Sequence, residues 1–106
     1  MPDGKKNKYD LTSVIDSEID ILKRHVKVLN AVAHNGPIGI IRLSEITGYP
    51  QHMVRYSLHV LEQKNIIKPS TKGAIVTDGF KEAIETLKKA LTNINSDIED
   101  ILSELS

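Results

Sequence analysis

Apolar residues recur three or four positions apart over residues 11–34, which is the spacing of one helix face. The residues of this face are Ile15, Ile19, Leu22, Val26, Leu29 and Ala33, and Val14, Ile21 and Val28 form an adjacent stripe. The pattern predicts a long helix. Asn35-Gly36-Pro37 should end it, because glycine can adopt the left-handed conformation past a helix end and proline cannot continue the helix.

Two shorter helices are predicted in the middle of the chain. A β-prone stretch at residues 38–41 leads into a two-turn helix at residues 42–48, which Gly48 closes. The next helix covers residues 50–64, and Pro50 suits its first turn because the missing amide proton is not needed there. Val54, Leu58 and Leu61 form one buried face of this helix, so its polar residues should point to solvent.

A β-hairpin is predicted after these helices. Residues 66–69 and 74–77 are short β-rich runs, separated by a polar loop at residues 70–73 that ends in glycine. Thr77 then resembles an N-cap, with Asp78 in the first turn of the last helix, where the helix dipole favours a negative charge.

The last helix carries an unbroken heptad pattern, in which apolar residues alternate between spacings of four and three. These residues are Phe80, Ile84, Leu87, Leu91, Ile94, Ile98, Ile101 and Leu105. The polar residues within residues 93–97 weaken the helix locally, and Ser96 with Glu99 could form a capping box that starts a new helix. One continuous helix is predicted, because the hydrophobic phase is kept across this stretch.

Composition narrows the class of protein. A chain of 106 residues suits one compact domain, and 40% hydrophobic with 26% charged residues excludes disorder of the whole chain. With no cysteine, neither a disulfide nor a thiolate metal site can form, which fits a cytoplasmic protein. No apolar run is long enough for a membrane span or a signal peptide. The predicted fold is mainly α with a small β-hairpin (α+β).

The distribution of charge is more informative than the balance of 14 basic against 14 acidic residues. Residues 42–81 contain six basic residues, Arg42, Arg55, Lys64, Lys68, Lys72 and Lys81, against the three acidic residues Glu45, Glu62 and Asp78. Residues 93–106 contain four acids and no base. This asymmetry is expected if only the middle of the chain meets a phosphate backbone.

The predicted order of helix, short strand, short helix, turn, helix, hairpin and helix is that of a winged helix-turn-helix. Two stretches sharpen the match: residues 43–50 followed by Val54, Leu58, Leu61-Glu62 and Ile66-Ile67, and then Val76-Thr77-Asp78-Gly79. They resemble the corresponding parts of bacterial and archaeal winged-helix regulators of the MarR and PadR types, and the resemblance, archaeal in character, covers residues 22–91. The chain departs from the pattern at Asn65, where glycine is usual, and asparagine also reaches left-handed geometry.

The resemblance implies that the helix at residues 50–64 lies in the major groove of double-stranded DNA. Gln51 and Arg55 would read bases, because glutamine can pair bidentately with adenine and arginine with guanine. The alternative is that both are solvated surface residues. The helix has one arginine and no lysine before Lys64, which is sparse for a DNA reader.

Further DNA contacts are expected around this helix and on the wing, where they would position the protein without reading sequence. The candidates are Arg42, Ser44, His52, Tyr56, His59, Lys68, Ser70, Thr71 and Lys72. Tyr56 would contact a phosphate or pack at the helix edge, while His25 and His34 would be surface or interface residues. No metal or cofactor is expected, since His52 and His59 are seven residues apart, whereas chelating helical pairs usually sit at i, i+4.

The first and last helices are longer than a lone winged helix requires, so their apolar side chains need another surface. A coiled-coil homodimer supplies one and would place two recognition helices about one DNA turn apart. Its expected interface contains Val14, Ile15, Ile19, Ile21, Leu22, Leu87, Leu91, Ile94, Ile98, Ile101 and Leu105. The alternative is that both helices fold back within one chain.

The expected organisation is a flexible basic tail at residues 1–10, a DNA-binding domain at residues 11–92 and a dimerising extension at residues 93–106. The leading function is a homodimeric, sequence-specific transcriptional regulator, and the alternative is a winged-helix module that binds protein. An enzyme is not expected, since the sequence has no phosphate-cradling glycine loop, activated nucleophile or paired carboxylates. Analogy with MarR-type proteins allows a small-molecule effector, but no residue here argues for one.

Overall fold

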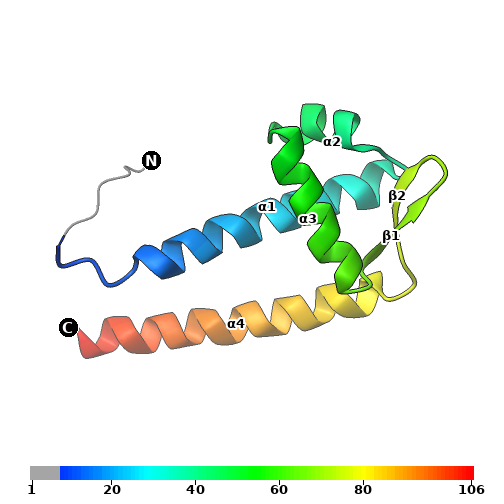
Figure 1. Cartoon of the computed structure of the whole chain (residues 1–106). Coiled ribbons are helices and arrows are strands. Elements are labelled where there is room, and N and C mark those ends of the chain that lie inside the picture. Colours follow the sequence, from blue (N-terminus) through cyan, green and yellow to red (C-terminus); the bar gives the residue numbers. More distant parts are fainter. Residues whose placement is uncertain (1–7) are drawn as a thin grey trace.

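Four helices and one hairpin make up residues 8–106, the part of the chain that the computed structural model describes (Figure 1). In chain order they are α1 (Ser13–Asn35), α2 (Ile40–Thr47), α3 (Gln51–Gln63), β1 (Ile67–Ser70), β2 (Gly73–Val76) and α4 (Phe80–Glu104). The prediction of a mainly α fold with a small β-hairpin is confirmed. Most of the predicted tail, residues 1–7, lies outside the described residues.

The hydrophobic core lies where the last turns of α1 meet α2, α3 and the hairpin. Val28, Val32, Leu43, Val54 and Ile67 are its most deeply buried apolar side chains, each less than 2% exposed. They come from four different elements, so the core joins these elements into one unit. The prediction that Val54, Leu58 and Leu61 share the buried face of α3 is confirmed.

Two turns are formed by left-handed residues, one at Gly48, which was predicted to end the helix, and one at Asn65, whose left-handed geometry was expected. Gly48 ends α2 at φ 81°, and Asn65 adopts φ 60° after α3. The same expectation is wrong for Gly36, which has φ −66° and ψ 150° at the end of α1. Glycine is needed there for close approach instead, because a Cβ atom at Gly36 would lie 2.6 Å from the Val32 carbonyl oxygen.

Only the first residue of the β-prone stretch at residues 38–41 pairs as a strand. The Ile38 N–H donates to the Ala74 carbonyl at 3.2 Å, and the Ala74 N–H donates to the Ile38 carbonyl at 2.8 Å. The helix then begins at Ile40, two residues earlier than predicted, with Gly39 accepting the first helical hydrogen bond from Leu43. This single bridge ties β2 to the start of α2.

The hairpin is tighter than the sequence predicts. Ser70 pairs with Gly73, so the strands are shifted by one residue and the loop contains only Thr71 and Lys72. The prediction that Thr77 caps the last helix is also wrong, because the N-cap is Gly79. Instead, the Thr77 hydroxyl donates to the Asn65 carbonyl at 2.6 Å and accepts from the Gly79 N–H at 3.2 Å, so it fastens the end of the hairpin to the end of α3.

The outer halves of α1 and α4 extend beyond the core in the same direction (Figure 1). α4 is continuous, as predicted, so no new helix starts at Ser96, and none of its residues is buried. The buried residues of α1 all lie between Val28 and Val32. The radius of gyration is 16.3 Å, compared with about 13 Å for a compact domain of 100 residues. The two long helices therefore form arms on a small core.

Candidate nucleic-acid interface

The exposed side of α3 carries most of the predicted DNA-binding residues. Packing of Val54, Leu58 and Leu61 against the core fixes the rotation of the helix. Apart from the buried Ser57, the remaining positions are therefore exposed or half-buried, and the exposed residues include Gln51, His52, Arg55, Tyr56 and His59. The structure confirms that these side chains are accessible, while their contact with DNA stays a prediction.

Arg42, Gln51 and Arg55 come together around one shallow hollow between the starts of α2 and α3, with a volume of about 580 Å³. The Arg42 guanidinium lies 3.5 Å from the Glu45 carboxylate, and both side chains are more than half exposed. An exposed ion pair of this kind is weak, so Arg42 can exchange Glu45 for a phosphate at little cost. Glu45 nevertheless reduces the positive potential of this surface.

Two predicted contact residues already use their hydroxyls within the fold. The Ser44 hydroxyl donates to the Tyr49 carbonyl at 2.7 Å, which fastens the turn between α2 and α3. The Ser70 hydroxyl donates to the Gly73 carbonyl at 2.6 Å and accepts from the Lys72 N–H at 3.3 Å, which closes the hairpin loop. Lys68, Thr71 and Lys72 are exposed on the hairpin and are accessible to a ligand.

A polar cluster between α1 and α3 was not foreseen from the sequence. The Ser57 hydroxyl is fully buried, accepts from Arg24 Nε at 3.1 Å and lies 2.8 Å from His25 Nδ1. The Tyr56 ring lies beside both, 5.9 Å from the His25 ring centre and 5.8 Å from the Arg24 guanidinium. Tyr56 therefore packs at the edge of α3 that faces α1. The position of Ser57 could have predicted this cluster, because it falls on the buried face of α3 and a buried hydroxyl needs a hydrogen-bond partner.

This environment favours the neutral imidazole of His25. Burial, and then the positive charge of Arg24, lower the pKa of His25 below its usual value of 6.5. With a neutral ring, the Ser57 hydroxyl can donate to Nδ1 while its oxygen accepts from Arg24. The Ser57 hydroxyl then both donates and accepts, and the contact needs no second buried charge.

Acidification should therefore destabilise the fold through His25. Because its pKa is lower in the folded state, the unfolded chain binds more protons below about pH 6.5, and stability falls as the pH falls until the folded pKa has been passed. Urea midpoints measured at about pH 7.5 and about pH 5.5 should differ less for His25→Gln than for the wild type. An unchanged difference in His25→Gln would show that another group controls the pH dependence.

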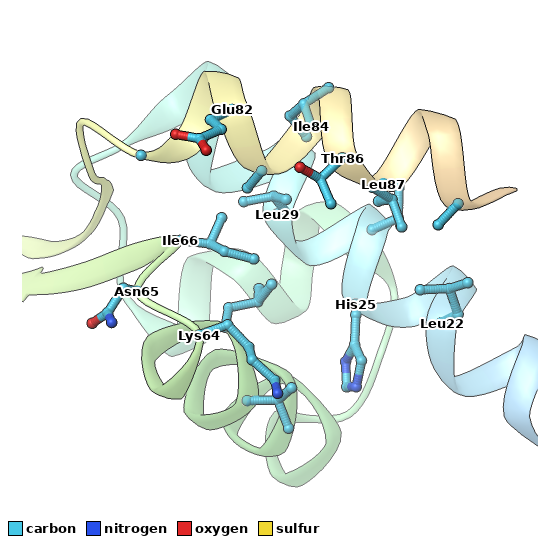
Figure 2. A pocket seen from close by; sticks show the side chains of 16 residues that line it. Leu22, His25, Leu29, Lys64, Asn65, Ile66, Glu82, Ile84, Thr86 and Leu87 are labelled. Carbon is cyan, nitrogen blue, oxygen red and sulfur yellow. The ribbon is translucent and has the colours of Figure 1, made fainter.

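The predicted dimer residues are exposed or half-buried, and two of them, Leu22 and Leu87, line an apolar groove between α1 and α4 (Figure 2). The groove has a volume of about 630 Å³. Its apolar lining comprises Leu22, Val26, Leu29, Val60, Leu61, Ile66, Ala83, Ile84, Leu87 and Ala90. Beyond the groove, Ile94, Ile98, Ile101 and Leu105 are 44–78% exposed along α4, and Val14 and Ile15 are 72% and 56% exposed on α1.

No metal site accompanies these surfaces, since residues 8–106 contain no group of three or more histidine, cysteine, aspartate or glutamate side chains placed to hold an ion. Within the same residues, no helix combines the length and apolar character that crossing a bilayer requires.

Comparison with solved structures identifies a similar fold in a transcription factor. The chain matches the activation domain of the phage T4 transcription factor MotA with a TM-score of 0.56 and 20% sequence identity, over 82% of this chain and 94% of that one. The helices with a small β-hairpin are thus an arrangement found in a known protein. No protein-family model matches the sequence, and no curated protein matches it.

Proposed function

We propose that this chain is a homodimeric transcriptional regulator that binds specific sequences in double-stranded DNA. The observation that carries the proposal is the outward face of α3, where Gln51 and Arg55 meet Arg42 around one hollow. The rigid core behind α3 would present these side chains to base edges in the major groove, and Lys72 at the hairpin tip would reach the backbone or minor groove. The proposal includes that the regulator is similar to MarR or PadR proteins, that it is archaeal and that it acts in the cytoplasm.

The structural neighbour supports a role in transcription, because it belongs to a transcription factor. The same neighbour gives weight to a second candidate, a module that binds another protein, because it is an activation domain. Glu45 beside Arg42 and the single arginine of α3 also fit that candidate. DNA binding is favoured here because the exposed residues of α3 and the hairpin tip include cations and hydrogen-bond donors suited to bases and phosphates.

Salt dependence separates the two candidates. Fluorescence anisotropy against labelled genomic fragments should show an affinity that falls steeply as salt rises, because each neutralised phosphate releases counterions. Absence of binding at low salt would reject the DNA proposal and leave the protein-binding candidate.

Arg55→Ala and Lys72→Ala should have different effects. Loss of a bidentate arginine contact removes about 1–3 kcal/mol of base discrimination, so Arg55→Ala should bind preferred and random fragments with more similar affinities. Lys72→Ala should weaken all fragments about equally and lower the salt slope by about 1. Lys89→Ala removes the same charge from exposed α4, away from α3 and the hairpin, and should change neither property at protein concentrations that keep the chain dimeric. Retained preference in Arg55→Ala would mean that α3 is not oriented as proposed.

A further inference from the structure

Among residues 8–106, which the structure describes, the apolar stripe of α4 continues from the core into solvent without a partner. Phe80, Ile84 and Leu87 are half-buried near the core, and beyond Leu87 the exposed fraction rises from 36% at Leu91 to 78% at Leu105. The groove between α1 and α4 opens beside the inner half of this stripe, and Figure 2 shows Leu22 and Leu29 across from Ile84 and Leu87. One helix of this chain thus carries both a wall of an apolar groove and a free apolar stripe.

The spacing of the stripe reads the same in both directions. Alternating steps of four and three residues match a second α4 that runs antiparallel, with the two-fold axis between Thr92 and Asn93. Every residue of the stripe then lies opposite another one, and the opposing pairs are Phe80 with Leu105, Ile84 with Ile101, Leu87 with Ile98, and Leu91 with Ile94. This match uses all eight stripe residues, and it places the outer half of one α4 along the inner half of the other, beside the groove.

Charge along α4 favours the same direction. The inner half, residues 80–92, carries Lys81, Lys88 and Lys89 against two glutamates, whereas residues 93–106 carry four acids and no base. α1 is divided in the opposite order, with three acids in residues 13–20 and only basic charges in residues 21–35. The acidic residues of the two outer halves are Asp16, Glu18, Asp20, Asp97, Glu99, Asp100 and Glu104.

This distribution of charge disfavours contact between the outer halves of α1 and α4 of one chain. Both acidic halves extend from the same end of the core (Figure 1), so their mutual contact would bring like charges together. The groove lies between the basic segments of α1 and α4, and its own lining carries one cation, Lys64, and one anion, Glu82. An acidic outer half is therefore complementary to the basic segments that border the groove of another copy and not to the arm beside it.

We infer that the groove between α1 and α4 is filled by the outer half of α4 from a second copy of this chain, in an antiparallel pair. Residues 94–105 of each copy pack in the groove of the other copy, which is the self-complementary contact that two-fold symmetry requires. Ala83 and Ala90, which line the groove beside the stripe, leave room for the second helix to approach. The inference rests on the homodimer of the proposed function and specifies how its two copies meet.

The stoichiometry test uses two substitutions that introduce the same charge. Ile98→Asp places a carboxylate within the stripe, and Ser96→Asp places one on the opposite side of α4, two residues away. Sedimentation equilibrium at micromolar concentration should give a dimer for the wild type and for Ser96→Asp. Ile98→Asp should weaken association by roughly 100-fold or more, because an unpaired carboxylate is costly to bury. It should leave a folded monomer, as checked by circular dichroism. A monomeric wild type, or an Ile98→Asp variant that still dimerises, would overturn the inference.

The direction of the pair is tested with spin labels, because the chain has no cysteine and each label site can be introduced alone. With the axis between Thr92 and Asn93, labels on Ser103→Cys should lie about 30 Å apart along the helices, and labels on Ser96→Cys about 10 Å apart. Distances below about 20 Å for Ser103→Cys would indicate a parallel pair and refute the antiparallel arrangement while leaving the homodimer intact. DNA titration of the wild type decides the DNA proposal separately.

Discussion

Gly73→Ala should be among the most damaging single substitutions in this chain. Gly73 has φ 129°, and a Cβ atom there would lie 2.4 Å from the Ile38 carbonyl carbon and 2.6 Å from its oxygen. Because the obstacle is backbone, the bridge between Ile38 and Ala74 must move, and strain together with overpacking should cost roughly 2–5 kcal/mol. Urea unfolding at one protein concentration measures the loss, because association with a second copy would otherwise change the apparent stability.

Gly39→Ala is the matched control for this prediction. A Cβ atom at Gly39 meets nothing within 4 Å, and the residue has an ordinary φ of −96°. Its substitution should cost only about 1 kcal/mol or less, because alanine is a poorer N-cap than glycine. Equal losses for the two variants would show that the bridge at Ile38 does not constrain Gly73.

Leu43→Ala should remove about 2–5 kcal/mol from the free energy of unfolding, which combines lost transfer free energy with the cavity left behind. Leu43 is 0% exposed and lies at the centre of the core that α2 shares with α1 and α3. A loss of this size should lower the melting temperature by roughly 10 °C or more. Thermal unfolding followed by circular dichroism at a fixed protein concentration provides the measurement.

Ile41→Ala tests whether burial is the cause. Ile41 lies in the same helix and is 65% exposed, so its substitution should change stability by no more than about 0.5 kcal/mol. If Ile41→Ala destabilised the protein as much as Leu43→Ala, its side chain would have to be covered in solution. Such a result would indicate an interface on the exposed face of α2.

The periodic elements were predictable because periodicity reports burial along one helix. The heptad spacing of α4 and the buried positions of α3 were therefore visible in the sequence, and Asn65 was correctly predicted to be left-handed. The errors fall at Gly36, at residues 38–41, at the ends of the hairpin strands and at Thr77. The sequence correctly placed a helix end, a β-prone stretch, a hairpin and a helix start at these positions, but not their detailed conformation. Except in the hairpin, a partner distant in sequence decided the conformation at each of these places.

The candidate interface likewise combines features that the sequence predicts with features that only the tertiary structure creates. Exposure of Gln51 and Arg55 followed from the helical pattern, whereas their grouping with Arg42 depends on the angle between α2 and α3. The contact of Arg24 and His25 with Ser57 joins residues more than 30 positions apart, and no spacing rule indicates it. The engagement of Ser44 and Ser70 within the fold likewise appears only when the turn and hairpin are formed.

The sequence by itself determined the order and approximate extent of the helices, which face of each helix is apolar, and how charge divides along α1 and α4, because all three are properties of local order along the chain. Only the tertiary structure decided where α2 begins, why Gly36 and Gly73 must be glycine, and that α1 and α4 leave an apolar groove between them. These features depend on backbone and side chains that meet across long stretches of sequence, and packing in three dimensions selects them.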